Sequence, residues 1–339
     1  MPTNTSPEYK SAEAAYRRAR DPQERLDCLR EMHRTIPKHK GTEHLRAGIK
    51  TRIKELTDEL STSQKTGARG GPPTVIKAEG AAQIALIGPP NGGKSALHAR
   101  LTGSHVASEP YPFATQFPQP GMYAYEDVAF QLVDQPSLSP EHPISWIGNA
   151  LQPADAALFI VDLGAPGCLE RAMGAIDLLA ERRVILREAW PATTMGHAAI
   201  EGDDPFATYL PTLLVANKSD QIPDITEELE VFEELTGLRF PYMAVSAETG
   251  DGLDELGAWL FRMLGIVRVY TKVPGKDADM GRPFTVQHGD TVLDVATLVH
   301  RDIAASFKYA RLWGGGSFGG QQVGRDHIVE DGDVIEIHA

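Results

Sequence analysis

The chain has 339 residues and a formal net charge of −13, and 42% of its residues are hydrophobic, with a mean hydropathy of −0.25. This length predicts two or three domains with ordinary apolar cores. No apolar run approaches the roughly 18 residues that a membrane-spanning helix requires, and the polar residues 1–10 lack the apolar centre of a secretory signal. The widely separated Cys28 and Cys168 argue against a disulfide framework or a thiolate zinc site and fit a reducing cytosol.

The charges are unevenly distributed along the chain. Residues 1–77 carry 16 Lys and Arg against 10 Asp and Glu, which gives +6, whereas residues 78–265 carry 9 against 26, which gives −17. Residues 266–339 carry 8 against 10, which gives −2. A basic segment on an acidic body is typical of proteins that contact RNA. The alternative is a pair of helices whose basic side chains are simply solvated.

The first predicted unit is an N-terminal helical hairpin. Pro22 suits the first turn of a helix, and Pro37 and Gly41 then break the chain before a second, longer helix. Each helix carries an apolar stripe at helical spacing. The first stripe comprises Leu26, Leu29, Met32 and Ile36, and the second comprises Leu45, Ile49, Ile53, Leu56 and Leu60. Residues 64–73 end in a Gly- and Pro-rich run that predicts a flexible linker.

Between residues 80 and 265, short apolar runs alternate with helical patterns. This alternation predicts a doubly wound α/β domain with a mostly parallel sheet. The expected strands are 83–87, 129–133, 156–161, 212–216 and 242–245, and the expected helices are 94–101, 168–182, 226–234 and 253–264. We expect the breaker-rich stretch 187–209 to be an inserted loop.

From residue 266 onward the sequence changes to shorter strands and turns. The expected strands are 266–270, 284–286 and 334–337, and a helix is expected over 291–306. Asp331-Gly332 is a turn signal. The glycine-rich run 314–320 is followed by neither Lys-Ser nor Lys-Thr and opens no helix, so we interpret it as a loop.

Residues 88–95 read Gly-Pro-Pro-Asn-Gly-Gly-Lys-Ser, the pattern G-x-x-x-x-G-K-[ST], between a predicted strand and a predicted helix. The glycines let successive backbone N–H groups approach phosphate oxygens, and the helix presents its positive end to the same anion. Lys94 can reach the β- and γ-phosphates, and the Ser95 hydroxyl can ligate Mg²⁺. This context favours a phosphate-binding loop over an ordinary glycine-rich turn. The candidate contacts are Gly88, Asn91, Gly92, Gly93, Lys94, Ser95 and Ala96.

Residues 217–220, Asn-Lys-Ser-Asp, predict which nucleotide base is bound, and they lie directly after a predicted strand. The Asp220 carboxylate can accept hydrogen bonds from guanine N1–H and the 2-amino group, whereas adenine offers neither donor and would leave it unpaired. The Asn217 side chain can tether neighbouring backbone, and the stem of Lys218 can lie over the base face. At the next strand end, backbone N–H groups could approach guanine O6, although that tripeptide alone is nearly uninformative. It consists of Ser246, Ala247 and Glu248.

Two further residues predict a metal site beside the phosphates. Asp134 ends an apolar run, and a carboxylate at that strand end can hold the water shell of Mg²⁺. Thr115 lies between the phosphate loop and Asp134 in sequence, which is the place of a switch threonine that closes on Mg²⁺ and the γ-phosphate.

In this order, the motifs resemble those of the Obg superfamily of GTPases, most closely the DRG (developmentally regulated GTP-binding) family and its bacterial relatives. Residues 111–115, Tyr-Pro-Phe-Ala-Thr, are similar to the switch I sequence of Obg-type proteins, and the N-terminal helical pair resembles the helical arm of DRG proteins. Residues 270–272, 307–314 and 326–333 resemble parts of a TGS domain, a ubiquitin-like β-grasp module. The resemblance covers residues from about 20 to 339. It implies a helical arm (1–65), a linker (66–79), a GTPase or G domain (80–265) and a TGS domain (266–339).

The chain departs from the family pattern in switch II. The family's Asp-x-x-Gly reads Asp-Gln-Pro-Ser at residues 134–137. Ser137 keeps an N–H, but its Cβ narrows the accessible backbone conformations, so we expect weaker coupling of the γ-phosphate to this segment. Leu138 stands where other GTPases carry the glutamine that orients the attacking water, and Gln135 should point away from the phosphates.

Asn91 occupies the position at which potassium-activated GTPases of the superfamily carry an asparagine. The resemblance implies a K⁺ ion between Asn91 and the phosphates, where it could stabilise charge as an arginine finger does. The alternative is that Asn91 merely favours a turn conformation.

The resemblance implies a cytoplasmic, Mg²⁺-dependent GTPase that hydrolyses GTP to GDP as a nucleotide-dependent switch. We expect a basal rate on the order of 10⁻⁴ to 10⁻² s⁻¹. Lys94, Thr115 and Asp134 would be catalytic, and Ser95, Thr115 and Asp134 would hold Mg²⁺. The ribosome or ribosomal RNA is the implied partner, together with a protein activator; neither a membrane nor DNA is expected. The alternatives are a catalytically weak GTP-binding scaffold acting through its TGS domain and a sensor of guanosine alarmones.

Overall fold

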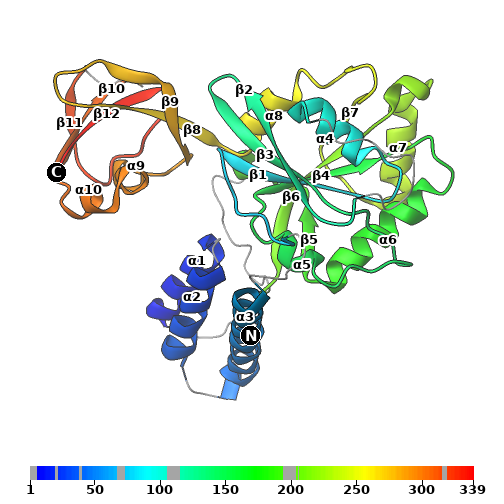
Figure 1. Cartoon of the computed structure of the whole chain (residues 1–339), viewed down its shortest axis with the longest axis horizontal. Coiled ribbons are helices and arrows are strands. Elements are labelled where there is room, and N and C mark those ends of the chain that lie inside the picture. Colours follow the sequence, from blue (N-terminus) through cyan, green and yellow to red (C-terminus); the bar gives the residue numbers. More distant parts are fainter. Residues whose placement is uncertain are drawn as a thin grey trace.

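The computed structural model describes residues 6–19, 22–37, 40–66, 73–104, 115–193, 204, 206–314 and 319–339. These residues form a helical bundle, a larger α/β part and a small sheet with its own helices (Figure 1). The predicted switch I residues 111–114 and residues 67–72 of the predicted linker lie outside the described residues. Among the described residues, no helix combines the length and the apolar character needed to cross a membrane.

The N-terminal part contains three α-helices rather than the predicted pair. They are α1 (Pro7–Arg18), α2 (Pro22–Thr35) and α3 (Glu43–Thr66), the last preceded by a 3₁₀ helix, η1 (Lys40–Thr42). Both predicted apolar stripes meet in one core. The additional helix α1 contributes Tyr9, Ala12 and Tyr16 to this core. Phe206, two residues before the strand that begins at Thr208 in the α/β part, completes this core and meets Tyr16 edge-on with ring centroids 6.5 Å apart.

The sheet of the α/β part has the order β2-β3-β1-β4-β6-β5, with β7 paired to β6. All of its pairings are parallel except that of β2 with β3. The strands are β1 (Ala82–Ile87), β2 (Gln119–Tyr125), β3 (Val128–Asp134), β4 (Ala156–Val161), β5 (Val184–Arg187), β6 (Thr208–Ala216) and β7 (Tyr242–Ala244). The five predicted strands are confirmed. The predicted loop 187–209 is too long, because Arg187 ends β5, Thr208 begins β6, and Trp190 between them is buried in the core.

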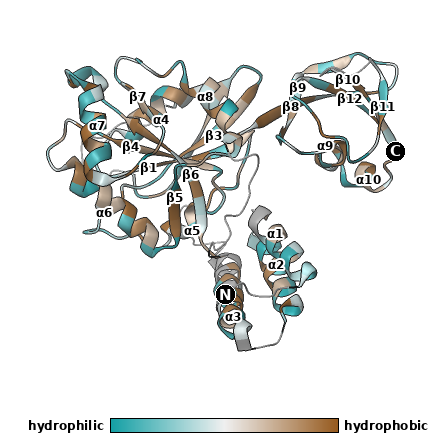
Figure 2. Cartoon of the chain, turned by 180° about the vertical axis from the view of Figure 1, so that it is seen from behind, coloured by the Kyte–Doolittle hydropathy of each residue, from teal (hydrophilic) through white to brown (hydrophobic). Residues whose placement is uncertain are grey.

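Helices cover both faces of this sheet (Figure 1). They are α4 (Lys94–Thr102), α5 (Ile147–Ala150), α6 (Cys168–Glu181), α7 (Ile225–Thr236) and α8 (Leu256–Met263). Alternate residues of β1 enter two separate cores: Ala85 and Ile87 pack with α6 and α7, whereas Ile84 and Leu86 pack with α4 and α8. Figure 2 shows the apolar central strands enclosed between helices with hydrophilic outer faces. The predicted doubly wound α/β fold is therefore confirmed.

The C-terminal part is a separate five-stranded sheet of order β11-β10-β12-β8-β9. Its elements are β8 (Ile266–Lys272), β9 (Ala278–Gln287), α9 (Val292–Val299), α10 (Arg301–Ala305), β10 (Tyr309–Trp313), β11 (Gln321–Val323) and β12 (Asp333–His338). The first and last strands pair in parallel at its centre, as in a β-grasp fold. The predicted helix 291–306 is broken at His300, which is extended and caps α10 with its side chain. Gly332 has φ +87° at the predicted turn.

A polar contact joins the two sheets. The tip of the β2–β3 hairpin, Glu126 and Asp127, meets β8 through Arg268, whose Nη1 lies 2.6 Å from Glu126 Oε2 and 3.0 Å from Asp127 Oδ1. The other side of the guanidinium binds Asp331 at 2.7 Å, and the Tyr270 hydroxyl donates to Asp127. The hairpin that leads into Asp134 at one end is thus anchored to the C-terminal sheet at the other.

Replacing Arg268 by alanine is expected to lower the free energy of unfolding by about 1–2 kcal/mol, since a 20% exposed guanidinium with three carboxylate partners is lost. Urea unfolding measures the loss, and hydrogen exchange should show faster opening at residues 126 and 127. Arg239→Ala is the matched control, because Arg239 is 76% exposed and its partner is 3.7 Å away. Equal exchange in both variants would contradict the anchoring role.

Candidate functional site

The backbone of the loop between β1 and α4 requires glycine, as Gly88 and Gly93 show. Gly88 has φ +145°, and a Cβ there would lie 2.3 Å from the carbonyl oxygen of Ile160. Gly93 has φ +89°, and a Cβ there would lie 2.1 Å from Nδ2 of Asn217. Asn91 also has a positive φ, +63°, a conformation that asparagine tolerates better than most residues. The turn interpretation of Asn91 is therefore supported by its backbone, and its side chain is exposed.

Lys94 is buried beneath this loop, with 5% of its surface exposed. Its Nζ donates to the carbonyl oxygens of Gly88 (3.2 Å) and Pro89 (2.9 Å) and to Oγ of Ser137 (3.0 Å). Burial lowers the pKa of the ammonium to about 8, and the nearby Asp134 carboxylate partly opposes this shift. Negative charge next to Lys94 would raise that pKa again, so the position favours binding of an anion.

The oxygens of Ser95, Thr115 and Asp134 converge beside Lys94, as the sequence predicts. Ser95 Oγ lies 2.6 Å from Asp134 Oδ2 and 3.1 Å from Thr115 Oγ1, and Thr115 Oγ1 lies 3.3 Å from Asp134 Oδ2. Burial raises the pKa of Asp134, against the lowering effect of its hydrogen bond from Ser95. Its other oxygen, Oδ1, is buried and has no hydrogen-bond partner among the described residues. Such a set of hard oxygen donors, with a free carboxylate oxygen, fits Mg²⁺.

Asn217 ties two loops together. Its side chain is 1% exposed; Nδ2 donates to the carbonyl oxygen of Gly92 (2.9 Å), and Oδ1 accepts from the Ala247 N–H (3.0 Å). The predicted tether is therefore seen in the structure, between the phosphate loop and the loop after β7. The amide oxygen and one N–H of the Asn217 side chain therefore hold these two loops in position relative to each other.

The remaining predicted base contacts lie around this tether. Lys218 has φ +63° and pairs with Asp162 at 2.7 Å, while Asp220 is exposed on the short 3₁₀ helix η3 (Ser219–Gln221). Ser246 is fully buried and accepts from the Thr249 N–H. The N–H of Ala247 is donated to Asn217, and Glu248 is exposed. Sequence reasoning missed Asp162, although its position directly after the strand β4 marks the same edge of the sheet.

Switch II begins in a fixed position against the phosphate loop. The Gln135 N–H donates to the Leu86 carbonyl (3.1 Å), and the Leu138 N–H donates to the Gly88 carbonyl (3.0 Å). The side chains of Gln135 and Leu138 are each 1% exposed, and Leu138 packs in the core with α6 and α7. Neither side chain is therefore available to orient a water molecule.

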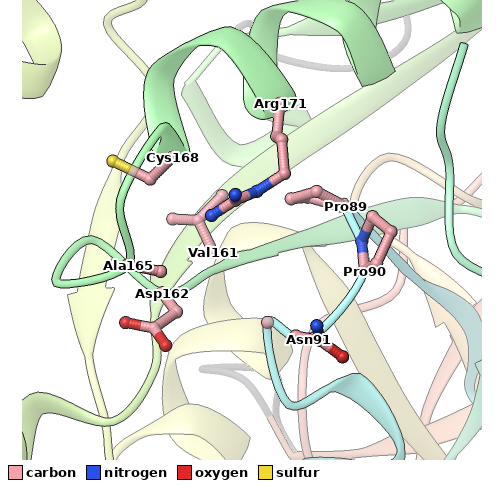
Figure 3. Close-up of a pocket in the computed structure, with 9 residues that line it drawn as sticks. Pro89, Pro90, Asn91, Val161, Asp162, Ala165, Cys168 and Arg171 are labelled. Carbon is pink, nitrogen blue, oxygen red and sulfur yellow. The ribbon is translucent and has the colours of Figure 1, made fainter. Parts of the chain in front are cut away.

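A small pocket opens on the outer side of the phosphate loop (Figure 3). The loop residues Pro89 and Asn91 face the start of α6 across it, where Cys168 and Arg171 lie (Figure 3). Asp162, the partner of Lys218, forms part of its wall. The pocket therefore adjoins both the phosphate loop and the predicted base site.

Two segments of the chain match known families. Residues 83–189 match a profile described as "50S ribosome-binding GTPase", and residues 267–339 match the TGS domain. Together with the sheet order and the phosphate loop, these matches define the protein as a P-loop GTPase with a C-terminal TGS domain. The predicted boundaries at residues 65, 79 and 265 stay predictions.

Relatives align over most of the chain. A protein of Methanocaldococcus jannaschii named "Uncharacterized GTP-binding protein" is 27% identical over 93% of this chain and 92% of its own. Developmentally-regulated GTP-binding protein 1 of Xenopus laevis is 28% identical over 91% of this chain and 96% of its own. Ribosome-interacting GTPase 1 of Saccharomyces cerevisiae is 26% identical over 91% of this chain and 96% of its own. The resemblance to the DRG GTPases is thus confirmed.

Proposed function

We propose that this protein binds GTP and hydrolyses it slowly to GDP in a Mg²⁺-dependent reaction, and so acts as a nucleotide-dependent switch. The observation that carries the proposal is the convergence of Ser95, Thr115 and Asp134 beside the buried ammonium of Lys94. Lys94 would neutralise the β- and γ-phosphates, and the three oxygens would hold Mg²⁺, which would stabilise charge on the leaving diphosphate. Asp220 would select guanine.

Backbone groups would carry much of the phosphate binding. The N–H groups of Lys94, Ser95 and Ala96 form the first turn of α4 and have no partner within the helix, so they would bind an anion that the helix dipole also favours. Asn217 would keep the phosphate loop aligned with the loop of Ser246, Ala247 and Glu248, so that phosphates and base are bound at a fixed separation. Because Gln135 and Leu138 are buried, we propose that a protein activator supplies the group that orients the attacking water.

Single-turnover hydrolysis tests this proposal. Purified nucleotide-free protein is mixed with GTP and Mg²⁺, and GDP formation is compared with that of Asp134→Ala. We expect GDP to form on the order of 10⁻⁴ to 10⁻² s⁻¹ and to fall to the background in the variant. GTP binding without GDP formation above the Asp134→Ala background, even with ribosomes present, would instead favour the scaffold function.

Potassium activation is tested by a variant that separates the two interpretations of Asn91. Asn91→Gly retains the left-handed backbone that φ +63° requires but removes the amide oxygen. If the side chain holds K⁺, the variant should lose a stimulation of about 10-fold by KCl over NaCl, while its affinity for GDP stays within about 2-fold. Equal rates of GTP hydrolysis by the unchanged protein in KCl and in NaCl would contradict the proposed K⁺ site.

We further propose the ribosome, or ribosomal RNA, as the partner, and the cytoplasm as the location. The proposal is supported by the names of the matching family and of the yeast relative and by the +6 charge of residues 1–77. The basic arm and the TGS domain would make the contacts. Co-sedimentation with ribosomes in GDP, GTP and a non-hydrolysable analogue should show tighter binding with the triphosphates. Absence of co-sedimentation in all three states would contradict the proposed partner.

A further inference from the structure

Ser137, which stands in place of the motif glycine, binds the lysine of the phosphate loop. Its Oγ lies 3.0 Å from Lys94 Nζ. An ammonium carries three N–H donors, and in the described part of the chain three acceptors surround this one: the carbonyl oxygens of Gly88 and Pro89 and the Ser137 hydroxyl. A phosphate oxygen that binds Lys94 must therefore replace one of these contacts.

The three acceptors are not equally easy to replace. The carbonyl of Gly88 also accepts the Leu138 N–H at 3.0 Å, and Gly88 and Pro89 belong to the phosphate loop itself, whose shape the ligand needs. The Ser137 hydroxyl can leave by rotation about a single side-chain bond. Its backbone is held beside Lys94, because Gln135 and Leu138 on either side of Pro136 and Ser137 are bonded to Leu86 and Gly88.

We propose that Ser137 determines nucleotide specificity by lowering the preference for GTP over GDP. Its hydroxyl holds an N–H of Lys94 that the γ-phosphate of GTP requires in addition to the one used by the β-phosphate. By the resemblance of residues 134–137 to Asp-x-x-Gly, residue 137 stands where that motif meets the γ-phosphate, so the γ-phosphate would take the N–H that the hydroxyl holds, whereas GDP has no group there to displace it. Glycine at this position carries no competing oxygen. Serine in its place therefore adds a competing acceptor for Lys94 as well as narrowing the accessible backbone conformations. The inference rests on the proposed binding of GTP at this site.

The test is the ratio of two dissociation constants, GDP over a non-hydrolysable GTP analogue, measured with Mg²⁺ by titration of nucleotide-free protein. Ser137→Ala removes the hydroxyl and keeps the Cβ. We expect the ratio to rise by about 3- to 10-fold in Ser137→Ala, the effect of removing one competing hydrogen bond to a charged group. Ser137→Gly should give a rise at least as large, whereas Ser137→Thr, which retains a hydroxyl, should stay within about 2-fold of the unchanged protein.

Ser139→Ala is the matched control. Its hydroxyl is also part of switch II, but it accepts from the Glu141 N–H at 3.3 Å and does not contact Lys94. The ratio should not change in this variant. An unchanged or lower ratio in Ser137→Ala would overturn the inference, because the hydroxyl would then be neutral or would assist binding of the γ-phosphate.

Failure of the inference and failure of the proposed function are distinguishable. If guanine nucleotides bind in preference to adenine nucleotides but Ser137→Ala does not raise the ratio, only the role of Ser137 is wrong. If the unchanged protein shows no guanine preference, both are wrong. Circular dichroism of each variant confirms that the ratio is measured on folded protein.

Discussion

Asp220→Asn is expected to weaken GTP binding by roughly 100-fold, because the hydrogen bond from N1–H loses its charged acceptor and the one from the 2-amino group is lost. The asparagine amide would place its own N–H donors against the 2-amino group of guanine. The same amide is complementary to xanthine, which carries a carbonyl at that position. We therefore expect the variant to bind xanthosine triphosphate more tightly than GTP, so that the base preference is exchanged and not merely lost.

Titration of nucleotide-free protein with GTP, ATP and xanthosine triphosphate measures this exchange. Asp220 is exposed on η3, so its replacement should change the free energy of unfolding by no more than about 0.5 kcal/mol. Gln221→Ala, an exposed neighbour on the same short helix, is the matched control and should bind GTP as the unchanged protein does. Unaltered GTP affinity in Asp220→Asn would remove the assignment of guanine.

Asn217→Ala is expected to lower the free energy of unfolding by about 2–4 kcal/mol and to weaken binding of GDP and GTP alike. The side chain is 1% exposed, and its loss leaves the Gly92 carbonyl and the Ala247 N–H without their partner. Both groups lie in loops that the proposed ligand joins. The effect on affinity should be independent of the number of phosphates, since Asn217 aligns the phosphate loop with the base loop.

Urea unfolding and GDP titration check this prediction separately. Asn217→Asp is an informative second variant, because it keeps an acceptor for Ala247 but turns a carboxylate oxygen toward the Gly92 carbonyl. It should be destabilised at least as much as the alanine variant, whereas Gln221→Ala should not be. If both Asn217 variants instead unfold with free energies within about 0.5 kcal/mol of that of the unchanged protein, the Asn217 contacts contribute little to the stability of the protein.

Short-range signals in the sequence were sufficient for most of the architecture. Strands buried on both faces, such as 156–161, appear as continuous apolar runs and were located correctly. The edge strand β2 was missed because it contains proline and glycine and exposes alternate residues, and β5 was missed because it has only four residues. The break at His300 was missed because the apolar pattern on either side of it continues without a proline or glycine.

The sequence by itself determined the candidate residues for the proposed chemistry: those that would bind phosphate, the carboxylate that would select guanine and the oxygens that would hold Mg²⁺. Those signals are local, because a glycine loop and the motif after a strand are each defined by a few consecutive residues. Only the tertiary structure decided which two loops the Asn217 side chain joins, that Ser137 binds Lys94 and that Arg268 joins the β2–β3 hairpin to the C-terminal sheet. Each of these contacts joins residues at least 30 positions apart, and spacing in a single chain does not specify which distant polar groups satisfy one another when they are buried.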